Sequence, residues 1–190
     1  MLTLDTPRLL LRPWREADLP AFAEMNSDPR VMEFMPKVLT REESDAMVRR
    51  NAEHVATHGF GKWAVEIKAG APFIGFVGLS VPAFDAPFMP CVELGYRLAF
   101  DHWGRGYATE GARAAIAFGF ATLGLAQIVA MTAVGNERSR RVMERVGMTH
   151  DAEAATLRPH APTCKANRGR PIATFSGGRV SPCDSDRTGR

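Results

Sequence analysis

The sequence predicts an α+β fold, or α/β sandwich, in which helices flank a mixed sheet. Three observations support this prediction. Helix signals come early in the chain, the middle alternates with the period of two that strands show, and a strand–helix–strand–helix order follows. With 190 residues, 45% of them hydrophobic and 24% charged, the chain has the size and composition of one soluble domain with room for an appendage.

The first predicted elements are a strand and two helices. The apolar run in Arg8–Trp14 is ended by a proline and predicts a short strand. Asp18 is placed to cap a short helix after it. Thr40 and Glu43 form a capping box, in which each side chain accepts a hydrogen bond from the other's backbone amide. This box predicts a second helix that ends near His58, before two closely spaced glycines.

The middle of the chain predicts three strands. Lys62–Lys68 alternates polar and apolar residues, and a Gly-Pro turn leads into Phe73–Leu79, so the two runs are expected to form a hairpin. A proline-rich loop over 82–90 precedes a third strand, Cys91–Phe100. Gly95 inside that strand indicates a bulge or a close approach of another backbone.

The last predicted elements alternate between helix and strand. Trp103–Glu110 is a glycine-rich turn that opens an alanine-rich helix to about Leu123. Gln127–Val134 is a strand-like run. Asn136 is placed to cap a final helix that ends at Gly147.

The charge distribution argues against a nucleic-acid-binding face. The net charge is +3, but residues 1–150 hold 17 Lys and Arg and 17 Asp and Glu, so the excess comes from 151–190. No apolar run is long enough to span a membrane, and no basic segment precedes an apolar stretch at the N-terminus. Cys91, Cys164 and Cys183 lack metal-ligand spacing. We therefore expect a cytoplasmic protein with reduced thiols and no metal.

The glycine-rich turn has the outline of an anion site. A helix N-terminus presents unpaired N–H groups, and Gly104 and Gly106 allow the backbone to approach a phosphate closely. The turn is not a Walker A loop, because no Gly-Lys-Ser/Thr follows. It also lacks the third glycine and the leading βαβ unit of the Rossmann fingerprint. Taken alone, the pattern fits a plain tight turn better than an anion site.

Two flanking motifs add to the turn. Glu93-Leu94-Gly95-Tyr96 precedes it, and Asn136-x-x-Ser139 with Glu144-Arg145-x-Gly147-Met148 follows it. With these motifs, the chain over about residues 5–150 resembles GNAT-type N-acetyltransferases, of the branch similar to the ribosomal-protein N-terminal (RimJ/RimL-like) acetyltransferases. The turn matches the family's Gln/Arg-x-x-Gly-x-Gly/Ala motif as Trp103-x-x-Gly106-x-Ala108, and Trp at the first place is usual in this branch. The resemblance implies a mostly antiparallel sheet.

The resemblance implies binding of acetyl-CoA as co-substrate, without a metal. Amides of the turn would face the pyrophosphate, the strand before it would pair with the pantetheine arm, and the last helix would line the other side of that arm. The implied cofactor-binding residues are Tyr96, Leu98, Trp103, Gly104, Arg105, Gly106, Tyr107, Ala108, Thr109, Asn136 and Ser139.

The implied reaction is direct attack of a primary amine on the thioester in a ternary complex. An ammonium ion must first lose a proton, so a base is needed, and the thioester oxygen needs an N–H donor. Glu93 is the candidate base, with a surface strand carboxylate as the alternative. Ser139 is the candidate acid or hydrogen-bond partner of the sulfur, with Tyr96 as the alternative acid. The oxyanion donor would be a bulged amide near Leu94 or Gly95.

Residues 151–190 do not fit the family pattern. Their large aliphatic and aromatic residues are few, and Arg, Pro, Ser, Thr and Gly are common, which favours disorder. We therefore expect the final strands of the sheet to be missing or altered, by a frame shift after about His150 or as a disordered extension. The strand Gln127–Val134 would then keep an unpaired edge.

Three functions remain open from the sequence. The first is an N-acetyltransferase acting on a protein N-terminus or a small amine, as a monomer or homodimer that binds neither nucleic acid nor membrane. The second is a CoA-binding module or damaged pseudoenzyme without turnover. The third is a nucleotide-phosphate-binding module that uses the same turn.

Overall fold

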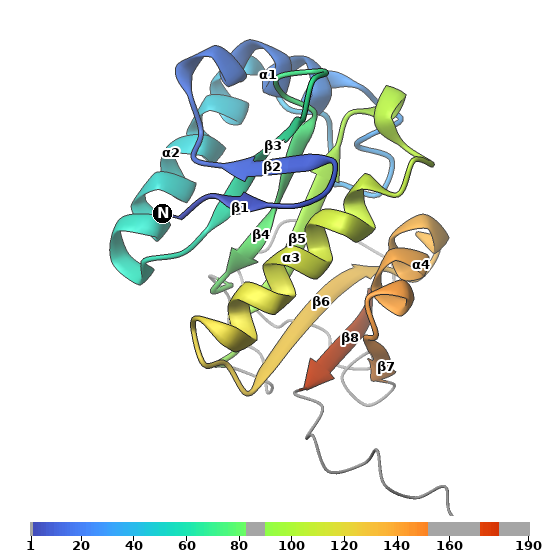
Figure 1. Ribbon diagram of the computed structural model, residues 1–190. Helices are drawn as coiled ribbons and strands as arrows, with labels where there is room; N and C mark the ends of the chain where they lie inside the picture. Colours follow the sequence, from blue (N-terminus) through green and yellow to red (C-terminus); the bar gives the residue numbers. More distant parts are fainter. Residues whose placement is uncertain (1, 83–89, 152–171, 179–190) are drawn as a thin grey trace, which may run out of the picture.

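One eight-stranded sheet organises the molecule, in a computed structural model that describes residues 2–82, 90–151 and 172–178 (Figure 1). The strand order is β1-β2-β3-β4-β5-β6-β8-β7, and all neighbours are antiparallel except the parallel pair β5 and β6. The strands are β1 (Leu4–Asp5), β2 (Leu9–Arg12), β3 (Lys62–Ile67), β4 (Gly75–Ser80), β5 (Glu93–Leu98), β6 (Gln127–Ala133), β7 (Thr149–Asp151) and β8 (Ile172–Gly178).

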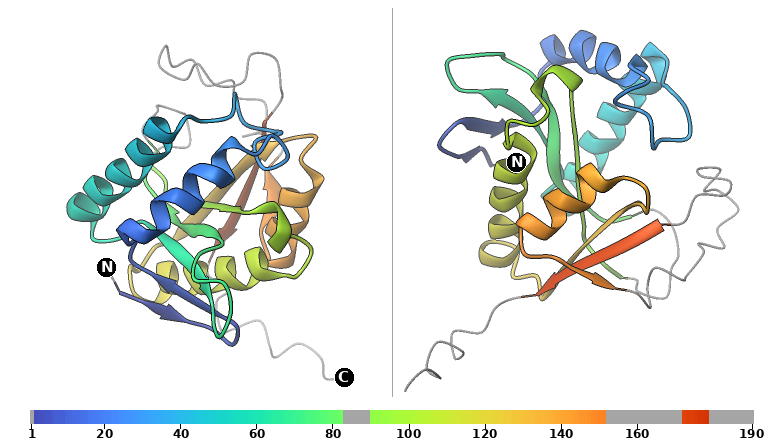
Figure 2. Two further views of the ribbon diagram at one scale, coloured as in Figure 1. Left: turned by 90° about the horizontal axis from the view of Figure 1, so that it is seen from above. Right: turned by 90° about the vertical axis from the view of Figure 1, so that its right-hand side faces the viewer.

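Helices cover both faces of this sheet (Figure 2). They are η1 (Glu16–Asp18), α1 (Leu19–Ser27), α2 (Arg41–His58), η2 (Phe100–His102), α3 (Tyr107–Ala121) and α4 (Glu137–Arg145). Helices α3 and α4 pack on one face, over a large core that includes Trp63, Val77 and Leu94. Helices α1 and α2 pack on the other face, over a smaller cluster around Phe22 and Phe76. The predicted mixed, mostly antiparallel sheet flanked by helices is confirmed.

Local sequence signals place most elements where they were predicted. The Glu43 amide donates to the Thr40 hydroxyl, and the Thr40 amide donates to the Glu43 carboxylate, so the capping box begins α2. Gly59 ends α2 with a φ of 77°, a left-handed conformation that glycine adopts without strain. Strands β3 and β4 form the predicted antiparallel hairpin.

The prediction that the final strands are missing is wrong. Strand β8 pairs with β6 over seven residues and with β7 on its other side, so the edge of β6 opposite β5 is paired. The sequence Ile172-Ala173-Thr174-Phe175 holds β-branched and aromatic residues that favour strands, although the run is short and lies in a polar segment. Pairing on both sides satisfies the backbone of such a strand without a long apolar run.

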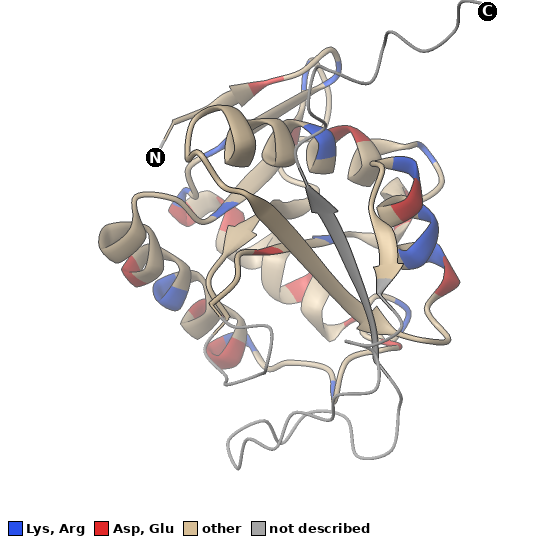
Figure 3. Ribbon diagram, turned by 90° about the horizontal axis from the view of Figure 1, so that it is seen from below, with Lys and Arg blue, Asp and Glu red and all other residues tan. Residues whose placement is uncertain are grey.

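Several expectations fall on residues outside the described part of the chain. They concern residues 83–89 of the proline-rich loop expected over 82–90, residues 152–171 and 179–190 of the segment 151–190 for which disorder or a frame shift is proposed, and the thiols Cys164 and Cys183. Within the described ranges, no helix combines the length and the apolar character that crossing a membrane requires. Figure 3 shows acidic and basic residues interspersed along the outer helices, with a basic stretch on α4.

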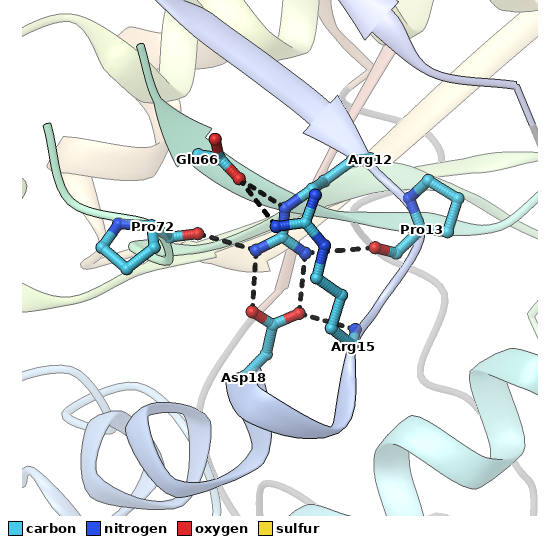
Figure 4. A network of polar contacts seen from close by, with 6 residues as sticks. All are labelled: Arg12, Pro13, Arg15, Asp18, Glu66 and Pro72. Carbon is cyan, nitrogen blue, oxygen red and sulfur yellow. Dashed lines mark hydrogen bonds and ion pairs between the residues drawn. The ribbon is translucent and has the colours of Figure 1, made fainter. Parts of the chain in front are cut away.

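A buried ion-pair network joins β2, β3 and η1 (Figure 4). The Arg12 guanidinium, 3% exposed, donates to both carboxylate oxygens of Asp18 at 2.8 Å, to Glu66 at 2.7 Å, and to the carbonyls of Pro13 and Pro72. These bonds use all five N–H groups that an arginine has. The hydrogen bonds to Asp18 raise the pKa of Arg12 above its ordinary value.

This network corrects the predicted role of Asp18. Asp18 does occupy the N-cap position of α1, but its side chain caps no amide of that helix. It binds Arg12 and accepts a hydrogen bond from the Arg15 amide instead. A carboxylate gains more from a bidentate, charge-assisted pair than from a single amide donor, so the ion pair takes precedence over the cap.

His54 on α2 is held in one neutral form. Its Nδ1 lies 2.9 Å from the Phe60 carbonyl oxygen, and its Nε2 lies 2.9 Å from the Val81 amide. The amide can only donate, so Nε2 accepts and Nδ1 carries the proton. Burial lowers the pKa of His54, because the charged ring is poorly solvated there.

We therefore expect stability to fall on mild acidification. The folded pKa of His54 is depressed, so below about pH 6.5, the ordinary histidine pKa, the unfolded chain binds more protons than the folded one, and protonation breaks the Val81 bond. The urea midpoint should drop between pH 7.5 and 5.5. His54→Gln should reduce that drop, while His150→Gln, a change at an exposed histidine of β7, should keep it. Equal pH dependence in all three proteins would contradict this role.

Candidate acetyl-transfer site

The sheet has a seam between its two parallel strands. Only one residue pair, Glu93 with Val129, joins β5 to β6, with the Val129 amide donating to the Val92 carbonyl at 2.9 Å. Beyond this pair each strand continues without the other. The Ala99 amide donates to the Ile74 carbonyl next to β4, so by alternation the amides of Leu94, Tyr96 and Leu98 point away from β4. The Leu94 amide lies within the pair with β6, and the amides of Tyr96 and Leu98 lie beyond it and face the seam. The seam therefore offers a peptide-like ladder to a ligand.

The N-terminus of α4 closes one side of the seam. The Tyr96 hydroxyl lies 2.9 Å from both the carbonyl oxygen and the hydroxyl oxygen of Ser139. If Tyr96 donates to the carbonyl, the Ser139 hydroxyl donates to Tyr96, because each group has one proton. Burial raises the pKa of Tyr96 to about 12, so Tyr96 keeps its proton at neutral pH. Asn136 uses its side-chain oxygen to cap α4 at the Ser139 amide.

The glycine turn lies at the start of α3. Gly104 and Gly106 have φ of 74° and 79°, a left-handed geometry that other residues rarely adopt. Gly106 is the N-cap and provides no side-chain acceptor, so the first amides of α3, from Tyr107 to Thr109, have no cap. A Cβ added at Gly104 would meet nothing within 4 Å, so its backbone is open to a ligand. This arrangement fits a phosphate group.

Arg8 holds the turn in place. Its guanidinium donates to the Arg105 carbonyl at 2.9 Å and to Glu110 at 2.6 Å, and it stacks on the Tyr107 ring. Arg8 also lines a hollow of about 700 Å³ beside the turn. The residues lining that hollow are Asp5, Thr6, Pro7, Arg8, Gly106, Thr109, Glu110, Arg113, Ala114 and Arg145.

Trp103 connects the turn to the seam rather than presenting its indole N–H to a ligand. Its Nε1 donates to the Leu98 carbonyl at 2.8 Å, and Arg138 from α4 lies over its ring. The Leu98 carbonyl, which was expected to pair with pantetheine, thus already has one donor. Next to it, His102 Nδ1 is buried with no hydrogen-bond partner among the described residues, so this corner of the turn retains an unsatisfied polar atom.

The predicted bulge near Leu94 and Gly95 is not present. Strands β4 and β5 pair without interruption from Gly75 with Leu98 to Ser80 with Glu93. The Gly95 amide alternates toward β4, and the Leu94 amide lies within the pair of β5 with β6, where the Val129 carbonyl faces it, so both amides are engaged in the ladders of the sheet. The close approach expected at Gly95 comes from a side chain, since a Cβ there would lie 3.2 Å from Lys62 Cε.

Glu93 lies where the seam closes, on the sheet face that α1 and α2 cover. Burial raises the pKa of Glu93, and the positive charge of Lys62 partly offsets that effect. A carboxylate with a raised pKa is a better proton acceptor near neutral pH than an ordinary one. Tyr96 alternates to the opposite face of β5, so the candidate base and the Tyr96–Ser139 pair lie on opposite sides of the strand.

Sequence reasoning missed Lys62 and Arg97. Both lie on the same sheet face as Glu93, and Arg97 follows it at the period of two along β5. The alternation Glu93-Gly95-Arg97 between apolar neighbours was a signal for one shared face. The position of Lys62 could be found only from the pairing of β3 with β4 and of β4 with β5.

Comparison with known proteins decides the family. The family model described as "Acetyltransferase (GNAT) domain" matches residues 8–149. The chain belongs to the GNAT acetyltransferase family. The predictions of this family and of an N-acetyltransferase are confirmed. The match covers the seam, the turn and α4, so all the candidate residues lie within the GNAT domain.

Relatives and solved structures agree with this assignment. The chain is 34% identical to the Aspergillus fumigatus FsC-acetyl coenzyme A-N(2)-transacetylase over 155 residues, which are 78% of this chain and 65% of that protein. It is 39% identical to the putative ribosomal N-acetyltransferase YdaF of Bacillus subtilis over 62 residues, 33% and 34% of the two chains. A crystal structure of an acetyltransferase from Agrobacterium tumefaciens superposes with a TM-score of 0.76 at 27% identity, covering 94% and 95% of the two chains.

The GNAT domain was predicted to work without a metal. Among residues 2–82, 90–151 and 172–178, no three His, Cys, Asp or Glu side chains are grouped as metal ligands would be. That observation covers only this part of the chain, and the prediction of metal-free chemistry stays a prediction.

Proposed function

We propose that this protein transfers an acetyl group from acetyl-CoA to a primary amine, by direct attack in a ternary complex. The observation that carries the proposal is the seam. Its unpaired strand amides continue toward an uncapped helix N-terminus at a glycine turn. A pantetheine arm needs the first feature, and a pyrophosphate needs the second. When bound, acetyl-CoA supplies the activated acetyl group.

The chain's own residues would supply binding, a base and an acid. The amides of Tyr96 and Leu98 bind the pantetheine arm, and those of the turn bind phosphate. Glu93 removes the ammonium proton, directly or through a water. The Ser139 hydroxyl, whose proton goes to Tyr96 in the free protein, would turn and donate to the leaving sulfur.

The first test is binding. Acetyl-CoA at about 100 times its Kd should add roughly 2.7 kcal/mol to the free energy of unfolding, which raises the Tm by about 5–10 °C for a domain of this size. A thermal melt of the full chain with acetyl-CoA measures this, with ATP as the comparison ligand. ATP should give no comparable shift, because the strand amides of the seam have no partner in ATP.

The second test is turnover. Release of the CoA thiol in the presence of a panel of amines should exceed the release without amine. A saturable thermal shift with no amine-dependent thiol release would favour a CoA-binding module without turnover. A cooperative melt with no shift would reject acetyl-CoA as ligand, and an equal shift with ATP would favour a nucleotide-phosphate site.

A further inference from the structure

The sheet face under α1 and α2 carries a cluster of charged side chains, here called the charged row. Lys62, Gly78 and Gly95 pair side by side across β3, β4 and β5. Because the two glycines have no side chains, the Lys62 side chain lies over Gly78 and Gly95. Its Nζ lies 3.5 Å from where a Gly95 Cβ would be. Glu93 and Arg97 flank Gly95 on the same face of β5, so the Lys62 ammonium lies between them.

Arg97 binds only neutral groups among the residues that the structure describes. Its Nη1 donates to the Asn26 side-chain oxygen at 2.7 Å, its Nη2 to the Met35 sulfur at 3.0 Å, and Phe76 lies beneath it. Thioether sulfur is a weak acceptor, and these contacts use two of the five N–H groups of arginine. The guanidinium is therefore held in one orientation and still has donors to offer.

Lys62 is anchored at its backbone, and its ammonium has spare donors. The Lys62 amide and carbonyl are bound by Asn51, and the carbonyl also accepts from Trp14. The ammonium lies near the Phe76 ring. Among the residues that the structure describes, the carboxylate that acts on it is Glu93, at a separation too long for an ion pair. Glu33, on the same loop as Met35, is bound to Arg138.

Two cations therefore face one carboxylate on this half-buried surface. Burial lowers the pKa of Lys62 and lowers that of Arg97 to about 10, because the charged groups are poorly solvated there, and Glu93 offsets part of this effect on Lys62. A second anion beside them would restore the balance. An acceptor with an additional positive charge would add to the repulsion.

We propose that the acceptor amine carries a carboxylate, which binds Arg97 and Lys62 while the amine lies against Glu93. This inference rests on the proposed function and names the acceptor class for it. The planar guanidinium suits a carboxylate through two parallel hydrogen bonds, and the ammonium adds a point charge. The reaction would be amide formation on the amine nitrogen, with the CoA thiol as leaving group and the carboxylate unchanged.

The test compares each acceptor that carries a carboxylate with the corresponding carboxamide, which lacks that negative charge. Amino acids and their carboxamides differ in one charge at nearly equal size, and thiol release gives kcat/KM for each. We expect the wild-type protein to prefer the acid in at least one pair by about 10-fold or more, the size expected for a charge-assisted hydrogen bond. The amide has the amine that is easier to deprotonate, so intrinsic reactivity works against this result. The same comparison of kcat/KM is made for peptides that begin with Asp and peptides that begin with Asn. A preference for Asp in these peptides indicates a peptide N-terminus as acceptor, and a preference found only with amino acids indicates a free amino acid.

Variants assign the preference to the charged row. Arg97→Gln should reduce the acid-to-amide ratio at least 10-fold, mainly through KM, and Lys62→Gln should reduce it in the same direction. Arg97→Lys should restore part of the ratio. Arg41→Gln, at an exposed arginine of α2, should leave the ratio unchanged. The acetyl-CoA thermal shift verifies that each variant is folded.

Two results would overturn the inference, and they differ. If amines are acetylated but amides or polyamines match the acids in every pair, the acceptor class is wrong and acetyl transfer stands. If acetyl-CoA gives no shift and no amine of either charge is acetylated, the proposed function fails and the acceptor class with it.

Discussion

Replacing Glu93 with glutamine is expected to lower kcat/KM for acetyl transfer by about 100- to 10,000-fold at neutral pH. This is the range for loss of a positioned general base. Glutamine keeps the size and the polar contacts of the side chain but cannot take the ammonium proton. Because the turn and the seam amides are untouched, the thermal shift with acetyl-CoA should persist. Thiol-release kinetics with the best acceptor of the amine panel measures the effect.

The pH profile and a matched variant separate chemistry from structure. A base must be deprotonated, so the wild-type rate should fall as pH drops through the raised pKa of Glu93, and this limb should be lost in Glu93→Gln. Glu53→Gln, at an exposed glutamate of α2, should keep both rate and profile. Full activity in Glu93→Gln would exclude Glu93 as the base and leave it as a partner of Lys62.

Replacing Asp18 with asparagine is expected to cost about 3 kcal/mol of unfolding free energy. Removing one partner of a buried pair typically costs 3–5 kcal/mol, and Glu66 keeps part of the compensation for Arg12, so the lower end applies. Asparagine can accept from one Nη of Arg12, but its NH₂ then faces the other. Urea unfolding with a common slope measures the change.

The exposed pair Arg41–Asp45 provides the comparison. It joins the same two residue types one helical turn apart on α2, at 49% and 24% side-chain exposure, against 3% and 4% for Arg12–Asp18. Asp45→Asn should change the free energy of unfolding by about 0.5 kcal/mol or less. Similar losses in the two variants would show that burial does not set the value of the Arg12 network.

The features that depend only on nearby residues, such as helix caps and tight turns, were predicted correctly from the sequence. The Thr40 box, the stop at Gly59 and the glycine turn each depend on residues within one helical turn, and all three are observed. The role of Asp18 depended on Arg12, whose position is set by the pairing of β2 with β3. A residue with two possible uses cannot be assigned without that pairing.

The other misses have the same origin. Strand β8 has a weak pattern of its own and is held by ladders to β6 and β7, so its sequence alone did not show it. The charged row joins Lys62 to Glu93 and Arg97 through two register relations. The candidate site was predicted where motifs are contiguous, in the turn and α4, and missed where Lys62 of β3 reaches across β4 to Glu93 and Arg97 of β5.

The seam affects how much conformational entropy the protein loses when a second ligand binds. One residue pair carries the ladder between the five strands on one side and the three on the other, so the sheet is nearly two sheets. A ligand lying along β5 would supply the hydrogen bonds that β6 does not, and it would restrict the motion of the strands beside the seam. A second molecule arriving at the opposite face of β5 then meets a surface that is already ordered and loses less conformational entropy on binding. Two substrates bound at β5 would thus favour each other's binding by more than the contact between their reacting groups.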